Sequence, residues 1–361
     1  MWNYLLTQGA FILGFFMYKP LHKKTIVSVY KPIKFEGEWL FLRCLFFSSS
    51  ILYLTAQVIS YKVIGIPLLL GNHVDIYSNT GGWGVLGKII DVFKPISIFL
   101  LVYFIFENTT SLFFTLYKYF FLVVLVIFFA FSGSKSEFML LGFILFCYLI
   151  LNANKLSVYY NKIRSYELLL LSVGMVFVFF TIIFKHNKEP EEAGSLEIFL
   201  FRLVASGDVY YFAYPNNNIE LLNHSKPFLA LFGDVFSTLR IVPRTEQPVV
   251  LGFQLFNLFG VSDTVSGPNA RHNVFGYVYY GFYGSIVFSF CIGLLLSFAR
   301  NKLFYLLRRN LLGQVLFVLI YLQIAVVETD PQMVMSNLEN VVLLLPILLL
   351  VSFSATIILK S

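Results

Sequence analysis

The feature that most constrains this chain is a series of long apolar runs separated by short polar segments. A helix that crosses a lipid bilayer needs about 20 mostly apolar residues, and most of these runs reach or approach that length. Only 12% of the residues are charged, whereas a soluble domain carries about 25%. The sequence therefore excludes a water-soluble domain and predicts an all-α polytopic integral membrane protein, with a single membrane domain over residues 1–361. About nine transmembrane helices are predicted, over Trp2–Tyr18, Leu40–Ser60, Ile89–Phe106, Leu116–Phe131, Phe138–Leu151, Glu167–Phe184, Asn273–Phe298, Leu312–Val327 and Leu338–Leu359.

The basic residues predict how these spans are oriented. Lys and Arg are enriched in the cytoplasmic loops of membrane proteins, and here they concentrate in three short connections rather than on one face. The net charge of +7 therefore indicates topology and not nucleic-acid binding. The loops expected in the cytoplasm carry Lys19, Lys23, Lys24, Lys31 and Lys34 in the first, Lys155, Lys162 and Arg164 in the second, and Arg300, Lys302, Arg308 and Arg309 in the third.

With alternate loops inside, the N-terminus and four segments are expected on the far side of the membrane, namely residues 61–88, 132–137, 185–271 and 328–337. The first of these is an external loop. The segment 185–271 is the longest outside the spans, and it mixes apolar stretches with turn signals such as Pro215 and Pro243. We expect it to form a large periplasmic loop with short helices.

A lysine between two spans is the first candidate site. Lys135 is flanked by Ser134 and Ser136 in a connection with almost no room for a loop, so it must lie near the outer membrane face. An ammonium group and hydroxyl donors suit the phosphate of a lipid-linked substrate. The alternative is a structural turn whose lysine extends to the interface.

Two arginines in the large loop form the second candidate site. Arg240 and Arg244 flank Pro243, which prevents a continuous helix. Guanidinium groups bind phosphate oxygens with two hydrogen bonds and keep their charge at any working pH. The alternative is a solvated pair beside Glu246. Arg202, among aromatic residues earlier in the loop, either pairs with an acidic neighbour or adds a phosphate contact.

The pair Arg271 and His272 stands at the entry to an apolar run rich in Tyr and Gly, and it is the sharpest feature of the chain. The ordinary pKa of histidine is the closest to neutrality. His272 can therefore take a proton from a sugar hydroxyl while Arg271 steadies a leaving phosphate. The alternative is that a single interfacial histidine is a structural hydrogen-bonding group.

No metal or cofactor is predicted. The three cysteines lie inside apolar runs, and no Asp-x-Asp pair occurs, so the carboxylates that many glycosyltransferases use to bind a metal and a sugar nucleotide are missing. A lipid-linked sugar donor, which needs no such site, fits the composition better.

These segments resemble the Wzy-type O-antigen (oligosaccharide repeat unit) polymerases, with a more distant similarity to O-antigen ligases. Lys135 stands where the polymerases tend to have arginine, and the first outer loop has only His73 and Asp75 where relatives often place an arginine. The resemblance is carried by Gly65-Ile66-Pro67-Leu68-Leu69, Ser132-Gly133-Ser134-Lys135-Ser136, Val242-Pro243-Arg244 and, for the ligases, His272-Asn273-Val274-Phe275-Gly276.

The resemblance implies a fold similar to that of membrane glycosyltransferases with polyprenyl donors, in the bacterial inner membrane and with a periplasmic active face. It implies metal-independent transfer of a growing glycan from undecaprenyl pyrophosphate to a new lipid-linked repeat unit. A chain-length regulator is a candidate partner. In this interpretation His272 is the base or orienter of the acceptor hydroxyl, Arg271, Arg244 and Arg240 contact phosphates, Lys135 adds a point charge beside Ser134 and Ser136, and Arg202 is a further contact.

Three other functions fit parts of the pattern. A ligase would transfer the finished glycan to a lipid A core, and motifs separate it poorly from a polymerase. A flippase of lipid-linked oligosaccharide should place charges inside its spans, where this chain has few. A membrane acyltransferase would usually present its histidine to the cytoplasm, whereas His272 is predicted outside.

Overall fold

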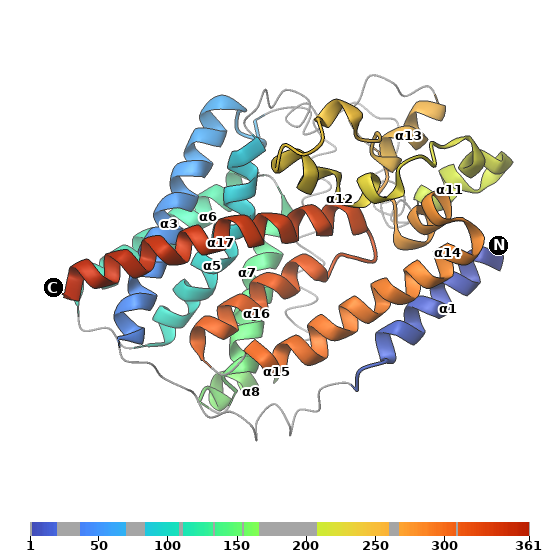
Figure 1. Ribbon diagram of the computed structural model, residues 1–361. Coiled ribbons are helices and arrows are strands. Elements are labelled where there is room, and N and C mark those ends of the chain that lie inside the picture. Colours follow the sequence, from blue (N-terminus) through green and yellow to red (C-terminus); the bar gives the residue numbers. More distant parts are fainter. Residues whose placement is uncertain are drawn as a thin grey trace, which may run out of the picture.

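The computed structural model describes residues 2–19, 37–69, 84–107, 111–132, 134–153, 155–165, 208–259, 267–307 and 310–360. Within these ranges the regular structure is entirely helical, as the sequence predicts (Figure 1). The elements are α1 (Trp2–Phe16), α3 (Glu38–Val63), α5 (Gly84–Phe106), α6 (Leu112–Ser132), α7 (Lys135–Leu151), α8 (Ser157–Ser165), α11 (Asp208–Ala213), η1 (Pro215–Leu221), α12 (Pro227–Thr238), η2 (Arg244–Glu246), α13 (Leu251–Leu258), α14 (His272–Ser297), the π-helix η3 (Phe298–Leu303), α15 (Phe304–Leu307), α16 (Leu311–Ile324) and α17 (Pro331–Lys360).

Five helices in the described part of the chain are long and apolar enough to cross a membrane, rather than nine. They are α3, α5, α6, α17 and the continuous segment His272–Leu307. Helices do occupy the predicted spans at α1, α7 and α16, but they contain only 15, 17 and 14 residues. At about 1.5 Å per residue these three are shorter than the ~30 Å hydrocarbon core. The predicted span Glu167–Phe184 lies outside the described residues.

Large aromatic side chains fill the first packing region, which we call the aromatic bundle and which consists of α3, α5, α6, α7 and α16. The ring of Phe46 on α3 is fully buried and contacts the rings of Phe104, Phe114 and Phe121. Packing between helices in lipid depends on close contact rather than on water exclusion. The phenylalanine-rich sequence therefore supplies the contact area that holds this bundle together.

Small residues form the second packing region, the polar pair of α1 and α14. A Cβ atom on Gly14 would lie 2.2 Å from the carbonyl oxygen of Phe290, and one on Gly293 would lie 2.1 Å from that of Phe11. The backbones are thus in direct contact, as small residues permit in membrane helices. The helix α1 and the part of α14 after Gly281 run in the same direction, since Asn3 near the beginning of α1 donates to Ser285 (2.8 Å) and the backbone N–H of Tyr18, after its end, donates to Ser297 (3.3 Å).

Segments that are predicted on the same side of the membrane lie at the same end of the helices. At one end the side chains of Lys155 and Glu107 form an ion pair, and Asn152 donates to Gln314 (3.0 Å), which joins the basic connections after α7 and α15. At the other end Lys88 donates to Thr238 (2.8 Å), which joins the start of α5 to α12. In Figure 1 the short helices α11, α12 and α13 gather at this second end. Which side of a membrane this end faces stays a prediction.

The predicted span Asn273–Phe298 is helical but does not run straight. Gly281 has φ 69° and ψ −171°, and it divides α14 into two arms, 272–280 and 282–297. The first arm folds back on the second, because a Cβ atom on Gly276 would lie 3.1 Å from the side chain of Ser285. In Figure 1 the short first arm lies beside the long second arm. Gly281 adopts the positive φ at little cost, and Gly276 and Ser285 let the arms approach.

Candidate functional site

The fold-back of α14 begins at Arg271, and this residue is the centre of the candidate site. Its backbone N–H donates to the carbonyl of Thr329 (2.8 Å), and that of His272 donates to Glu328 (3.0 Å). Its guanidinium forms an ion pair with Glu328 at 2.8 Å, with 19% and 28% of the two side chains exposed. The arginine has φ 43°, a conformation that L-residues seldom adopt. The turn between α16 and α17 therefore holds Arg271 from both its backbone and its side chain.

The ion pair lies in the turn between α16 and α17, near the middle of the second arm of α14 rather than at the Gly281 turn. His272 bonds to Ser289 at 2.9 Å, and Ser289 is seven residues after the start of the second arm of α14. At 1.5 Å per residue this corresponds to a depth of about 10 Å from the Gly281 turn. Charged residues at such positions in membrane proteins are costly, and they are commonly functional. The pair Arg271 and Glu328 is thus the strongest feature of the site.

His272 is completely buried. Its Nδ1 atom shares a hydrogen bond with the Ser289 hydroxyl, and its ring stacks on Phe11 of α1 at 4.8 Å between ring centroids. Among the described residues the buried Nε2 atom has no hydrogen-bond partner. This geometry fits the alternative of a structural hydrogen-bonding group, because the imidazole connects the first arm of α14 to both the second arm and α1.

A tyrosine from the short-helix region completes the surroundings of Arg271. The Tyr210 hydroxyl of α11 donates to Asn273 Oδ1 (3.1 Å), and the guanidinium of Arg271 lies 5.5 Å from the centroid of the Tyr210 ring. Burial raises the pKa of Tyr210, more than the hydrogen bond and the nearby arginine lower it. The phenol is therefore a neutral donor at physiological pH, fixed beside the ion pair.

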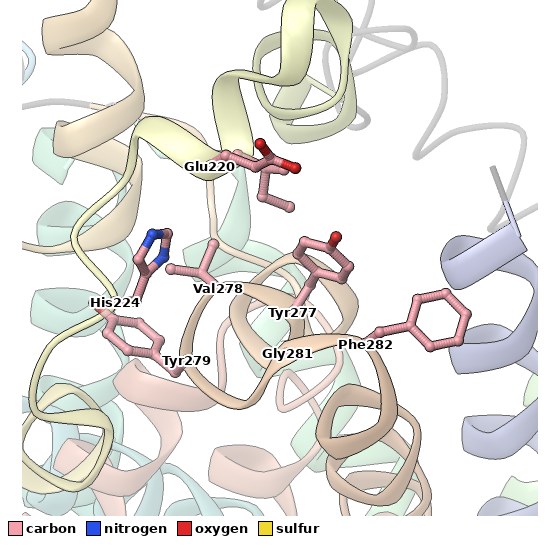
Figure 2. Close-up of a pocket in the computed structure, with 8 residues that line it drawn as sticks. Glu220, His224, Tyr277, Val278, Tyr279, Gly281 and Phe282 are labelled. Carbon is pink, nitrogen blue, oxygen red and sulfur yellow. The ribbon is translucent and has the colours of Figure 1, made fainter.

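A cavity of about 370 Å³ opens at the outer end of the first arm, near the Gly281 turn (Figure 2). Tyr277 and Tyr279 line it from α14, and Glu220 and His224 line it from η1 and the segment that follows. In Figure 2 the labelled side chains of Glu220 and Tyr277 lie on the upper side of the cavity and that of His224 at its left. Six residues separate Tyr277 from Arg271, about 9 Å along a helix.

The structure places the serine and lysine motif in a tight turn between α6 and α7. Ser134 precedes the first residue of α7, its hydroxyl lies 2.6 Å from that of Ser136, and its backbone N–H donates to Ser132 (3.1 Å). Lys135 begins α7, and its side chain is outside the described part. The next acidic residue, Glu137, forms an ion pair with Lys94 of α5 at 2.7 Å. This end of the motif thus ties α7 to α5.

Of the arginines predicted as phosphate contacts before Arg271 in the large loop, only Arg240 has a side chain that the structure describes. Arg240 follows α12 with φ 57° and an exposed side chain, close to the bond between Thr238 and Lys88 of α5. Arg244 begins η2, and its side chain is outside the described part, as is the whole of Arg202. Arg271 is instead joined to Glu328 and Tyr210.

Sequence reasoning did not single out the partners of Arg271 or the cavity residues. Glu328 lies 57 residues from Arg271, and no local spacing connects them. Glu220 and His224 are isolated polar residues in a long loop. The available signal was the repeated glycine at Gly276, Gly281 and Gly284 inside an apolar run, which is unusual for a straight span and typical of a turn or a close approach.

Comparison with family models, with curated proteins and with solved structures finds no match to this chain. Among the described residues, no three His, Cys, Asp or Glu side chains are grouped so that they could hold a metal ion. The resemblance to O-antigen polymerases therefore depends on the motifs quoted above alone, and a function has to be inferred from the arrangement of Arg271, its partners and the cavity.

Proposed function

We propose that this protein is a membrane glycosyltransferase of the O-antigen polymerase type. In this proposal it transfers a growing glycan from undecaprenyl pyrophosphate to a new lipid-linked repeat unit at the periplasmic face of the bacterial inner membrane. The observation that carries the proposal is the ion pair of Arg271 and Glu328, held about 10 Å below the Gly281 turn. The pyrophosphate of a polyprenyl lipid lies at a similar level, next to the hydrocarbon.

Arg271 suits a departing pyrophosphate for a physical reason. Displacement of the lipid carrier develops negative charge, and a guanidinium fixed in a partly dry site stabilises that charge without reorganising. The backbone N–H groups of Arg271 and His272 already donate to carbonyls of the α16–α17 turn. The guanidinium is therefore the group that meets the phosphate, and Glu328 keeps it oriented until the substrate binds.

The remaining predicted residues take supporting roles in this proposal. Arg240 and Arg244 contact phosphates of donor and acceptor from the α12 side, and Lys135 adds a point charge beside Ser134 and Ser136. His272 acts through position, because its ring joins the two arms of α14 to Phe11. A proton acceptor for the sugar hydroxyl would then come from another group, and the carboxylate of Glu220, which lines the cavity, is the candidate.

The test is complementation of a gene deletion, with surface glycans separated on a gel. Wild type, Arg271→Ala, Arg271→Lys and the control Arg300→Ala, at the opposite end of α14, are compared at equal membrane abundance. We expect no ladder with Arg271→Ala, a weak one with Arg271→Lys because lysine lacks the planar fork, and a full one with Arg300→Ala.

The deletion strain separates the candidate functions. A single repeat unit on the lipid core supports polymerisation. A bare core with accumulated long lipid-linked polymer identifies a ligase instead. A full ladder with Arg271→Ala contradicts the assignment of this site.

A further inference from the structure

We propose that the cavity beside the Gly281 turn is a binding site for an uncharged or amino sugar of the glycan. This inference rests on the proposed function, since it names the place where the sugar part of a lipid-linked substrate is held. The cavity is lined by Glu220, His224, Tyr277 and Tyr279. The two tyrosines belong to the Tyr- and Gly-rich run that follows Arg271 and His272, whereas Glu220 and His224 belong to none of the sequence motifs.

The size of the cavity fits a short piece of glycan. Its volume is about 370 Å³, at the small end of the range of about 300–1,000 Å³ for ligand pockets. It is a local recess at the end of a helix arm, so it accommodates a terminal segment of a saccharide chain and leaves the rest of a polymer outside. Recognition of the chain end is what a polymerising transferase requires.

The chemistry of the walls fits hydroxyl groups and sugar rings. The carboxylate of Glu220 accepts hydrogen bonds, the imidazole of His224 both accepts and donates, and the Tyr277 hydroxyl does the same. The phenol rings of Tyr277 and Tyr279 add apolar faces. Tyr279 is almost fully buried, whereas Glu220 and His224 are exposed to incoming ligand.

The charge of the walls argues against an anion. Within the described part of the chain the lining includes Glu220 and neither lysine nor arginine. The carboxylate of Glu220 would repel a phosphate or an acidic sugar in the cavity. A neutral sugar carries no charge that the carboxylate could repel, and the ammonium group of an amino sugar would be attracted to it.

The position of the cavity relative to Arg271 fits a lipid-linked glycan. Arg271 lies at the deep end of the first arm of α14, and Tyr277 lies about 9 Å farther out along that arm. A polyprenyl-linked saccharide has the same order, with its pyrophosphate next to the lipid and its sugars farther out. The first arm of α14 thus connects the proposed phosphate contact to the proposed sugar contact.

The test measures binding of a soluble saccharide, independently of any transfer reaction. The probe is the oligosaccharide released by mild acid from the surface polysaccharide of the host, with trigalacturonate as the acidic comparison. Full-length protein in lipid nanodiscs is titrated by saturation-transfer NMR. The variants are Glu220→Gln and the double variant Glu220→Gln, His224→Ala, and the control is Glu246→Gln, an exposed carboxylate outside the cavity.

We expect about tenfold weaker binding for Glu220→Gln, further loss for the double variant, wild-type binding for Glu246→Gln and no saturation transfer to trigalacturonate. Equal binding by wild type and the double variant, or preference for trigalacturonate, overturns the proposal. The glycan gel of the deletion strain decides the proposed function separately. Variant-sensitive binding together with an unchanged ladder in that strain supports the sugar site and overturns the polymerase assignment.

Discussion

The aromatic bundle and the polar pair solve the same problem, helix association in lipid, with different side chains. In the bundle, buried serines mostly bond to their own helix, as Ser49 and Ser97 do to the carbonyls of Phe46 and Phe93. In the polar pair the bonds cross between segments, from Asn3 to Ser285 and between His272 and Ser289. The bundle is thus held by ring contacts and serves as a scaffold, whereas the pair holds polar groups in fixed positions beside Arg271.

The first prediction concerns the bundle and has the largest expected effect. Phe46→Ala removes a fully buried ring that contacts five other rings. We expect a loss of about 3 kcal/mol in the free energy of unfolding, because the cavity cannot fill completely. Thermal unfolding in detergent measures it. Phe120→Ala, with 59% of its side chain exposed, should change little, and equal effects of the two variants would contradict a ring-packed core.

The second prediction concerns the close approach in the polar pair. Gly293→Ala places a methyl group 2.1 Å from the backbone oxygen of Phe11, so α1 must move away. We expect destabilisation of about 2 kcal/mol. Gly142→Ala, where a Cβ atom meets nothing within 4 Å, should instead stabilise slightly through helix propensity. Similar melting temperatures for the two variants would show that α1 and α14 are not in backbone contact.

The third prediction compares two fully buried serines. Ser289 forms a hydrogen bond between two helix segments, whereas Ser352 forms one within its own helix. Ser289→Ala leaves the Nδ1 atom of His272 without its hydrogen bond at 2.9 Å, and we expect a cost of about 1.5 kcal/mol. Ser352→Ala removes only a bond to the carbonyl of Leu348 on its own helix. That carbonyl also accepts the backbone hydrogen bond of the helix, so it keeps a partner. A smaller cost is expected there. If Ser289→Ala also abolishes the glycan ladder at normal abundance, the fold-back of α14 is needed for activity.

The fourth prediction tests the turn that joins both regions. Asp330 accepts a hydrogen bond from the backbone N–H of Met333 (2.9 Å) and so caps α17. Asp330→Ala should cost about 1 kcal/mol, and Asp330→Asn, which keeps the acceptor, a few tenths.

The same residue gives a pH dependence of known sign. Burial raises the pKa of Asp330, and hydrogen bonds to the backbone of Met333 and Gln332 offset this in part. A carboxyl group whose pKa is raised on folding favours the folded state once it is protonated. The stability of wild type relative to Asp330→Asn should therefore rise as the pH falls from neutral toward about 4. A relative fall over this range would contradict the burial of the carboxyl group.

Much of the helical framework was predictable from sequence. Apolar runs predicted the positions of α3, α5 and α6 to within a few residues, because the length of an apolar run is a local property, whereas α17 begins at Pro331, before the predicted start at Leu338. The shape of α14 was not predicted, because tertiary packing decides it. The repeated glycines around Gly281 indicate a turn or a close approach, but only the contact between Gly276 and Ser285 shows that the helix folds back.

For the candidate site too, one part was predictable from the sequence and another was decided by tertiary packing. The sequence by itself determined that the chain is a helical membrane protein and that Arg271 and His272 stand at the start of a helix. Only the tertiary structure decided that His272 is enclosed against Phe11 and that Arg271 pairs with Glu328. It also decided that Glu220 and His224 share a cavity with Tyr277. The physical reason is that span formation depends on neighbouring residues in lipid, whereas burial, pairing and cavities depend on segments far apart in the chain.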